Sequence, residues 1–133
     1  MSREAEDLWR RATRNLRTAA SLVEADPDSA ASRAYYAAFH AVAALFACEG
    51  KTFSTHKAVH TAVHRDLVKA GRWPAELGQA FAALVALRDT GDYGIGLHVT
   101  PEQATEAVGK AKSIVRAVRS TVSEPFPEEP PDM

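Results

Sequence analysis

The chain has 133 residues, of which 46% are hydrophobic and 25% charged, and its formal net charge at pH 7 is −1. This length fits one domain that can bury a core without disulfides or metals. The single cysteine, Cys48, excludes an internal disulfide. No run of about 18 apolar residues and no secretory leader pattern is seen, so we expect a cytoplasmic protein that does not enter membranes.

The charge is unevenly distributed along the chain. Residues 123–133 hold four acidic side chains and no lysine or arginine, whereas residues 1–122 hold 16 basic and 13 acidic side chains. The resulting net charge of +3 on the larger part permits contact with nucleic acid, although strong duplex-binding proteins are usually more basic. The proline- and glutamate-rich composition of residues 123–133 predicts a disordered acidic tail.

Helical periodicity dominates the first half of the chain. Asp26 and Pro27 predict the cap and first position of a helix that runs to about Cys48 and ends at Gly50. Because this helix is rich in alanine and apolar on most sides, we expect it to be the central one. A helix before it has arginines on a face that we interpret as solvated, and its core-facing stripe comprises Leu8, Ala12, Leu16, Ala19 and Val23.

Capping residues predict the next two helices. Ser54 or Thr55 is expected to start a third helix that ends at Gly71. Pro74 is expected to open a fourth helix that ends near Arg88.

Glycines then predict a loop over residues 89–99, because three glycines within six residues oppose a regular helix. Thr100-Pro101-Glu102-Gln103 predicts the start of a fifth helix with a capping box. Together these signals predict an all-α fold, an antiparallel, up-and-down bundle of four to five helices over residues 1–122.

Three motifs in order carry a family resemblance. They are Ser32–His40 (SRAYYAAFH), Thr55–Val59 (THKAV) and Arg88–Tyr93 (RDTGDY). At these spacings the chain resembles the small stand-alone prokaryotic HEPN proteins over about residues 1–120. The resemblance implies a helical bundle, usually a homodimer. Many such proteins are metal-independent ribonucleases, often toxins encoded beside a small nucleotidyltransferase antitoxin.

The usual HEPN signature is an arginine, four to six residues, and then a histidine, brought by two protomers into a shared cleft. There the arginine holds the scissile phosphate and the histidine helps the RNA 2′-hydroxyl attack it. In this chain the three positions open to that histidine hold Tyr93, Gly94 and Ile95, and nine residues separate Arg88 from His98. A phenol with a pKa near ~10 is a poor general base at neutral pH. The arginine of the signature therefore carries over, and the histidine does not.

Arg88 and Asp92 are the candidate catalytic residues. A guanidinium is well matched to a phosphate, and the alternative for Arg88 is a salt bridge to Asp92 or to another helix. Asp92 is either that partner or a base whose pKa is raised by burial.

Arg33, Tyr36, His56, Arg88 and Tyr93 are the candidate residues for binding RNA or a nucleotide. Arg33 and Tyr36 share a helix face three residues apart, in a helix that lines the cleft in the resembled family. The alternatives are that Tyr36 packs in the core and that Arg33 pairs with an acidic neighbour. Tyr93 would stack on a base or cross a dimer seam, or else be a core aromatic.

Three histidines at four-residue spacing, at positions 56, 60 and 64, resemble a metal-binding stripe. On a straight helix they would span ~12 Å, too far for one ion, so no metal site is expected. His56 separately matches the family pattern, and no cofactor motif is present.

Three functions remain open at this point. The first is an RNA- or nucleotide-binding component of a toxin–antitoxin-type system with a nucleotidyltransferase partner. The second is a metal-independent endoribonuclease in which Asp92, His56 or His98 replaces the missing base. The third is a purely structural helical module.

Overall fold

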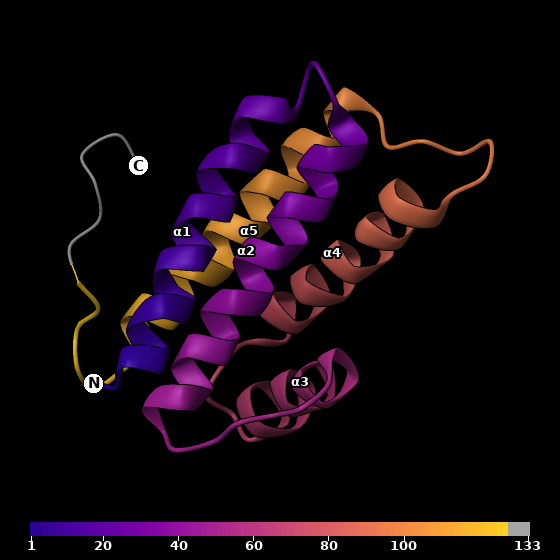
Figure 1. The fold of residues 1–133 in the computed structure, drawn as a ribbon. Coiled ribbons are helices and arrows are strands. Elements are labelled where there is room, and N and C mark those ends of the chain that lie inside the picture. The colour runs from indigo at the N-terminus through magenta and orange to yellow at the C-terminus, as the bar shows by residue number, and fades with distance from the viewer. Residues whose placement is uncertain (128–133) are drawn as a thin grey trace.

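The computed structural model describes residues 1–127, which form a bundle of five α-helices without a β-strand. The helices are α1 (Arg3–Leu22), α2 (Pro27–Cys48), α3 (His56–Ala62), α4 (Ala75–Tyr93) and α5 (Pro101–Thr121), and a π-helical segment η1 (Val63–Lys69) continues α3. Helices α1, α2, α4 and α5 run up and down along one direction, and α3 lies near the C-terminal end of α2 (Figure 1). The predicted all-α, antiparallel bundle is confirmed. None of the helices in the described range combines the length and apolar character that a membrane crossing requires.

Helix α2 is the centre of the bundle, as its composition predicts. It packs against α1, α4 and α5, and Figure 1 shows it between α1 and α4 with α5 behind. Seven of its buried residues are alanines, whose small side chains let the neighbouring helices approach closely. The larger buried side chains of Tyr35, Leu45 and Phe46 fill the volume between them.

The helix starts follow the capping signals read from the sequence. The side chain of Asp26 accepts a hydrogen bond from the amide of Ser29 at 3.2 Å, and Thr55 caps α3 in the same way. Thr100 and Gln103 form a reciprocal capping box at the start of α5. Each such cap contributes about 1 kcal/mol to stability.

The fourth helix differs from its prediction, because it continues through Arg88 to Tyr93. The expected loop over 89–99 is therefore wrong for residues 89–93. Gly91 does not break the helix. A Cβ at this position would lie 2.6 Å from the backbone oxygen of Asp28 in α2, so the missing side chain lets the last turns of α4 approach α2. This close packing overrides the low helix propensity of glycine.

Phe126 packs against the bundle, although the sequence predicts a disordered tail from residue 123. The ring of Phe126 is 9% exposed and stacks on Trp9, with centroids 4.2 Å apart and planes 3° apart. The N-terminal amino group of Met1 pairs with Glu124 at 2.9 Å. One aromatic side chain thus gains apolar burial that the segment's polar composition does not indicate. The rest of the predicted tail, residues 128–133, lies outside the described residues.

The contact at Gly91 can be tested with a matched pair of glycine substitutions. Gly91→Ala is expected to lower the free energy of unfolding by about 1–3 kcal/mol, because the new methyl group collides with the backbone of α2. Gly109→Ala, at an exposed helical position with nothing within 4 Å, should raise it by up to about 1 kcal/mol. Urea denaturation measures both changes. Equal responses of the two variants would contradict the close approach of α4 to α2.

Candidate functional site

Arg88 is held between α2 and α4. Its Nη2 donates a hydrogen bond to the hydroxyl of Tyr36 at 3.0 Å, and its Nε lies 3.1 Å from a carboxylate oxygen of Asp92, one turn later on α4. Its Nη1 lies 3.4 Å from Asp89. The Arg88 side chain remains 21% exposed. The arginine is therefore anchored on both helices and still reaches the surface.

Aromatic rings surround this guanidinium. Its central carbon lies 5.3–5.6 Å from the ring centroids of Tyr35, Tyr36 and Tyr93, within the range of cation–π attraction. Burial works against the charged form of Arg88, but the hydrogen bond to Tyr36 and the nearby Tyr93 and Asp92 outweigh it and raise the pKa. Arg88 is therefore a permanent cation at this site.

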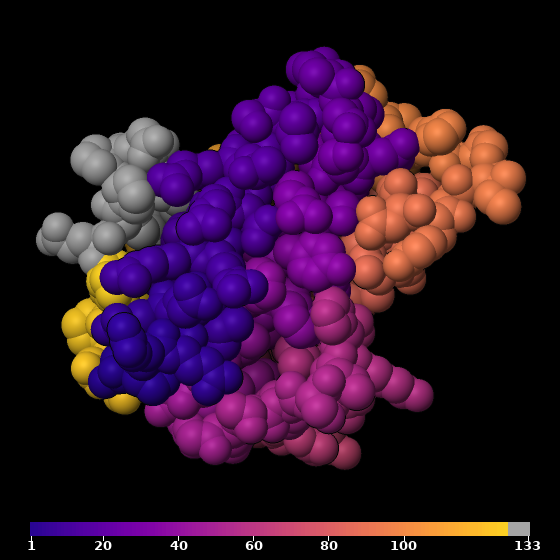
Figure 2. All heavy atoms as spheres, in the orientation of Figure 1, coloured from indigo at the N-terminus to yellow at the C-terminus, as the bar shows by residue number. Residues whose placement is uncertain are grey.

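Arg33 contacts the same tyrosine from α2. Its guanidinium carbon lies 5.4 Å from the Tyr36 ring centroid, and its Nη1 donates to the side-chain oxygen of Asn15 in α1 at 3.2 Å. This hydrogen bond goes to a neutral amide, not to the acidic neighbour that one sequence interpretation expects. Arg33 is exposed. Figure 2 shows that part of α2 reaches the surface between α1 and α4. Two arginines, Arg33 and Arg88, thus lie close to the Tyr36 ring.

Asp92 forms an ion pair with Arg88 of its own helix and accepts a hydrogen bond from α2. Besides Arg88, the hydroxyl of Ser32 in α2 donates to it at 3.3 Å. Asp92 is thus the ion-pair partner of Arg88, one of the two sequence alternatives, and its role as a base stays a prediction. His98 pairs with Asp28, since its Nδ1 is 2.9 Å from a carboxylate oxygen of that residue.

His56 joins the site from the first turn of α3. Its Nδ1 lies 3.0 Å from the hydroxyl of Tyr35, and Nε2 of His60 lies 2.7 Å from the same oxygen. The His56 ring stacks on Phe39 with centroids 4.2 Å apart, and its centroid is 5.8 Å from that of Tyr36. Burial lowers the pKa of both histidines, and for His56 the charge of Arg88 lowers it further. Both shifts favour the neutral form of the imidazole.

The structure thus brings together the six residues named as candidate catalytic or binding residues. Arg33, Arg88 and His56 contact Tyr36, and Asp92 and Tyr93 contact Arg88.

Tyr35 and His60 are the two members of this cluster that sequence reasoning does not assign to the site. Their signal was present in the chain, because His56 and His60 are one turn apart on a helix that must meet an aromatic face of α2. The third histidine of the stripe, His64, falls within η1, where the π-helical turn changes the register. Within residues 1–127, no group of three or more histidine, cysteine or acidic side chains is placed to hold a metal ion.

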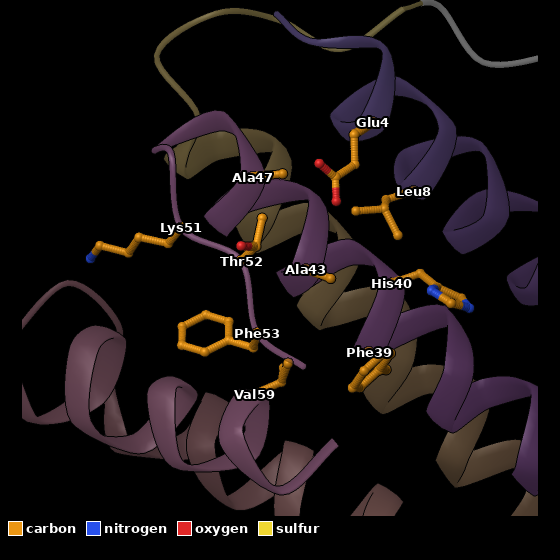
Figure 3. Close-up of a pocket in the computed structure, with 10 residues that line it drawn as sticks. All are labelled: Glu4, Leu8, Phe39, His40, Ala43, Ala47, Lys51, Thr52, Phe53 and Val59. Carbon is orange, nitrogen blue, oxygen red and sulfur yellow. The ribbon is translucent and has the colours of Figure 1, made fainter. Parts of the chain in front are cut away.

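A surface cavity of about 160 Å³ lies next to this cluster. Figure 3 shows it between α1, α2 and the segment that follows α2. Phe39 and His40 belong to its wall, and His40 also contacts Tyr36, with ring centroids 6.0 Å apart. Burial, followed by the charge of Arg11, lowers the pKa of His40 to about 4. The full lining is Glu4, Leu8, Phe39, His40, Ala43, Ala47, Lys51, Thr52, Phe53 and Val59.

Comparison with known proteins identifies the family. The HEPN domain model matches residues 5–121. A UPF0332 protein of Thermotoga maritima is 32% identical over 120 residues, which cover 89% of this chain and 91% of that protein. The crystal structure of TT1696 from Thermus thermophilus has the same fold, with a TM-score of 0.77 and 24% identity over 91% of this chain and 100% of that one. The resemblance seen in the sequence is confirmed, and the chain belongs to the HEPN domain family.

Proposed function

We propose that this HEPN protein binds RNA or a nucleotide at the surface formed by Arg33, Tyr36 and Arg88. The observation that carries the proposal is that two guanidiniums lie within 5.4–5.6 Å of the Tyr36 ring centroid, one of them exposed and the other 21% exposed. Sites for single-stranded nucleic acids combine cations that follow the phosphates with aromatic rings on which bases stack. Tyr93, which is 68% exposed beside Arg88, offers such a ring.

The partners of Arg88 differ in how easily an anion can replace them. Tyr36 and Asp92 hold the guanidinium from two helices. Asp89 is 59% exposed and lies 3.4 Å from Nη1, and exposed ion pairs of this kind are worth only about 0–1 kcal/mol. A phosphate that displaces Asp89 would gain a charge-assisted hydrogen bond. Arg88 would keep its position during the exchange.

The proposal includes a homodimer and a protein partner. The segment that follows α4 projects from the bundle (Figure 1) and carries Ile95, which is 96% exposed, and the exposed Leu97. Tyr93, which contacts Arg88, is also exposed, and a second copy of the chain would cover these three apolar side chains. Membership of the HEPN family supports a shared cleft between two protomers. It is also the sole support for a nucleotidyltransferase partner and a toxin–antitoxin setting.

Binding can be tested by fluorescence anisotropy with a labelled single-stranded RNA. Arg88→Gln and Arg33→Gln are each expected to weaken binding by about tenfold or more and to reduce the dependence of affinity on salt by about one counterion, because each removes a phosphate contact. Arg116→Gln removes the same charge from an exposed position of α5 and should leave the affinity within about twofold.

Circular dichroism and urea denaturation separate loss of binding from loss of fold. Arg33 is exposed, so its variant remains informative if Arg88→Gln destabilises the bundle. If Arg88→Gln, Arg33→Gln and the control Arg116→Gln bind RNA with equal affinity, the binding proposal is wrong and a purely structural helical module is favoured.

Self-association can be tested by light scattering after size-exclusion chromatography. We expect the unmodified protein to elute as a dimer. Ile95→Asp and Leu97→Asp should convert it to a monomer, since a charge would be buried at the interface without a partner. Ser113→Asp, at an exposed site on α5, serves as the control and should remain dimeric. A dimer that both apolar-site variants leave intact would show that this surface is not the interface.

Ribonuclease activity is the second candidate function, and one observation favours it. His56 contacts the Tyr36 ring, and the charge of Arg88 influences its pKa. An arginine and an exposed histidine therefore contact the same two tyrosines, Tyr35 and Tyr36, although the usual sequence spacing is absent. A neutral imidazole at this place can accept a proton from a ribose hydroxyl.

This activity is tested by incubating single-stranded RNA with the purified protein in a chelator. We expect cleavage that leaves 2′,3′-cyclic phosphate ends and is lost in His56→Ala. RNA that stays intact at high protein concentration, in a preparation free of any co-purified protein, would exclude the ribonuclease and leave the binding proposal standing.

A further inference from the structure

The hydroxyl of Tyr35 lies between two imidazole nitrogens. It is 3.0 Å from Nδ1 of His56 and 2.7 Å from Nε2 of His60, and the Tyr35 side chain is buried with 1% exposure. A hydroxyl carries one proton, so it donates to one neighbour and accepts from the other. One of the two histidines must therefore be protonated at the nitrogen that faces Tyr35.

The two contacts of the Tyr35 hydroxyl differ in length. Bonds donated to oxygen by N–H groups cluster near 2.9–3.0 Å, whereas bonds donated to oxygen by hydroxyl groups cluster near 2.7–2.8 Å, so a hydroxyl donor favours the shorter contact. We therefore assign the 2.7 Å contact to donation by Tyr35 to His60, and the 3.0 Å contact to donation by Nδ1–H of His56 to Tyr35. A neutral His56 then carries its lone pair on Nε2.

We propose that Tyr35 and His60 position His56 as the proton acceptor of an RNA-cleaving site, with Nε2 free to take a proton from a ribose 2′-hydroxyl. This proposal rests on the ribonuclease function proposed above and deepens it. His56 would take the place of the histidine that the Arg88–Tyr93 stretch lacks, and it comes from a different helix. Stacking on Phe39 at 4.2 Å fixes the plane of its ring.

The proposed step is balanced in atoms and charge. Nε2 of His56 accepts the 2′-hydroxyl proton, the 2′-oxygen forms a bond to phosphorus, and the bond from phosphorus to the 5′-oxygen breaks. The leaving 5′-oxygen takes a proton from water, and His56 returns its proton to solvent. Arg88 holds the phosphate oxygens. In this step Tyr35 and His60 contact none of the reacting atoms of the RNA, so they are positioning residues.

The positioning role of Tyr35 and His60 can be tested without RNA, by measuring which imidazole nitrogens carry protons. At neutral pH, ¹⁵N NMR of the imidazole nitrogens should show His56 and His60 both protonated at Nδ1 and not at Nε2. Tyr35→Phe keeps the buried ring and removes the hydroxyl, and should allow His56 to become protonated at Nε2. Two results would overturn the positioning of His56 by Tyr35. One is a wild-type His56 that is protonated at Nε2, and the other is a His56 tautomer that stays the same in Tyr35→Phe.

Activity supplies the second test. RNA cleavage in chelator should fall by about 100-fold or more in His56→Gln. It should fall by about tenfold or more in Tyr35→Phe, with the RNA affinity of this second variant unchanged. His64→Gln, which alters a histidine outside the Tyr35 contact, should cleave at the wild-type rate. If the wild-type protein does not cleave RNA although His56 carries the expected tautomer, the catalytic role fails and the positioning by Tyr35 stands. Full activity in Tyr35→Phe would refute the positioning role.

Discussion

The hydrogen bond from Arg88 to the hydroxyl of Tyr36 joins α4 to α2 at the point where the candidate residues meet. Placing a guanidinium partly out of water is costly unless charges and hydrogen bonds compensate. Here Asp92 supplies the charge and the tyrosine rings supply cation–π contacts. Because two helices hold the arginine, it keeps one geometry, and its pairing with the exposed Asp89 is weak enough to be exchanged for an anion. A cation that is both fixed and reachable is the property on which the binding and cleavage proposals depend.

The packing of α4 on α2 creates this geometry. The alanines of α2 allow close approach along its length, and Gly91 allows it at the far end of α4. Since α4 runs to Tyr93, Asp92 lies one helical turn after Arg88 and Tyr93 lies over the guanidinium. A helix that ended at Arg88 would leave these two residues in a loop, with no fixed relation to the arginine. The extension of α4 therefore converts a sequence motif into a site.

Much of the fold follows from local signals, because caps and apolar periodicity act over a few residues. The starts at Asp26, Thr55 and Thr100 are of this kind, as is the central position of α2. Contacts between distant segments could not be predicted in this way. The helical role of Gly91 depends on the backbone of α2, and the burial of Phe126 depends on Trp9. In the same way, motif resemblance predicts the candidate site residues. The contact between the Tyr35 hydroxyl and His60 cannot be predicted without knowing how α2 and α3 are arranged.

The most direct test of the central claim is the NMR signal of the arginine Nε groups during titration with single-stranded RNA. The account predicts that Arg88 and Arg33 shift together and saturate together, because both contact the same Tyr36 ring. Arg72, which is bound to Glu49 at the other end of α2, should not move. A titration in which Arg88 stays unchanged, or in which Arg72 shifts as much as Arg88, would contradict a specific anion site between α2 and α4.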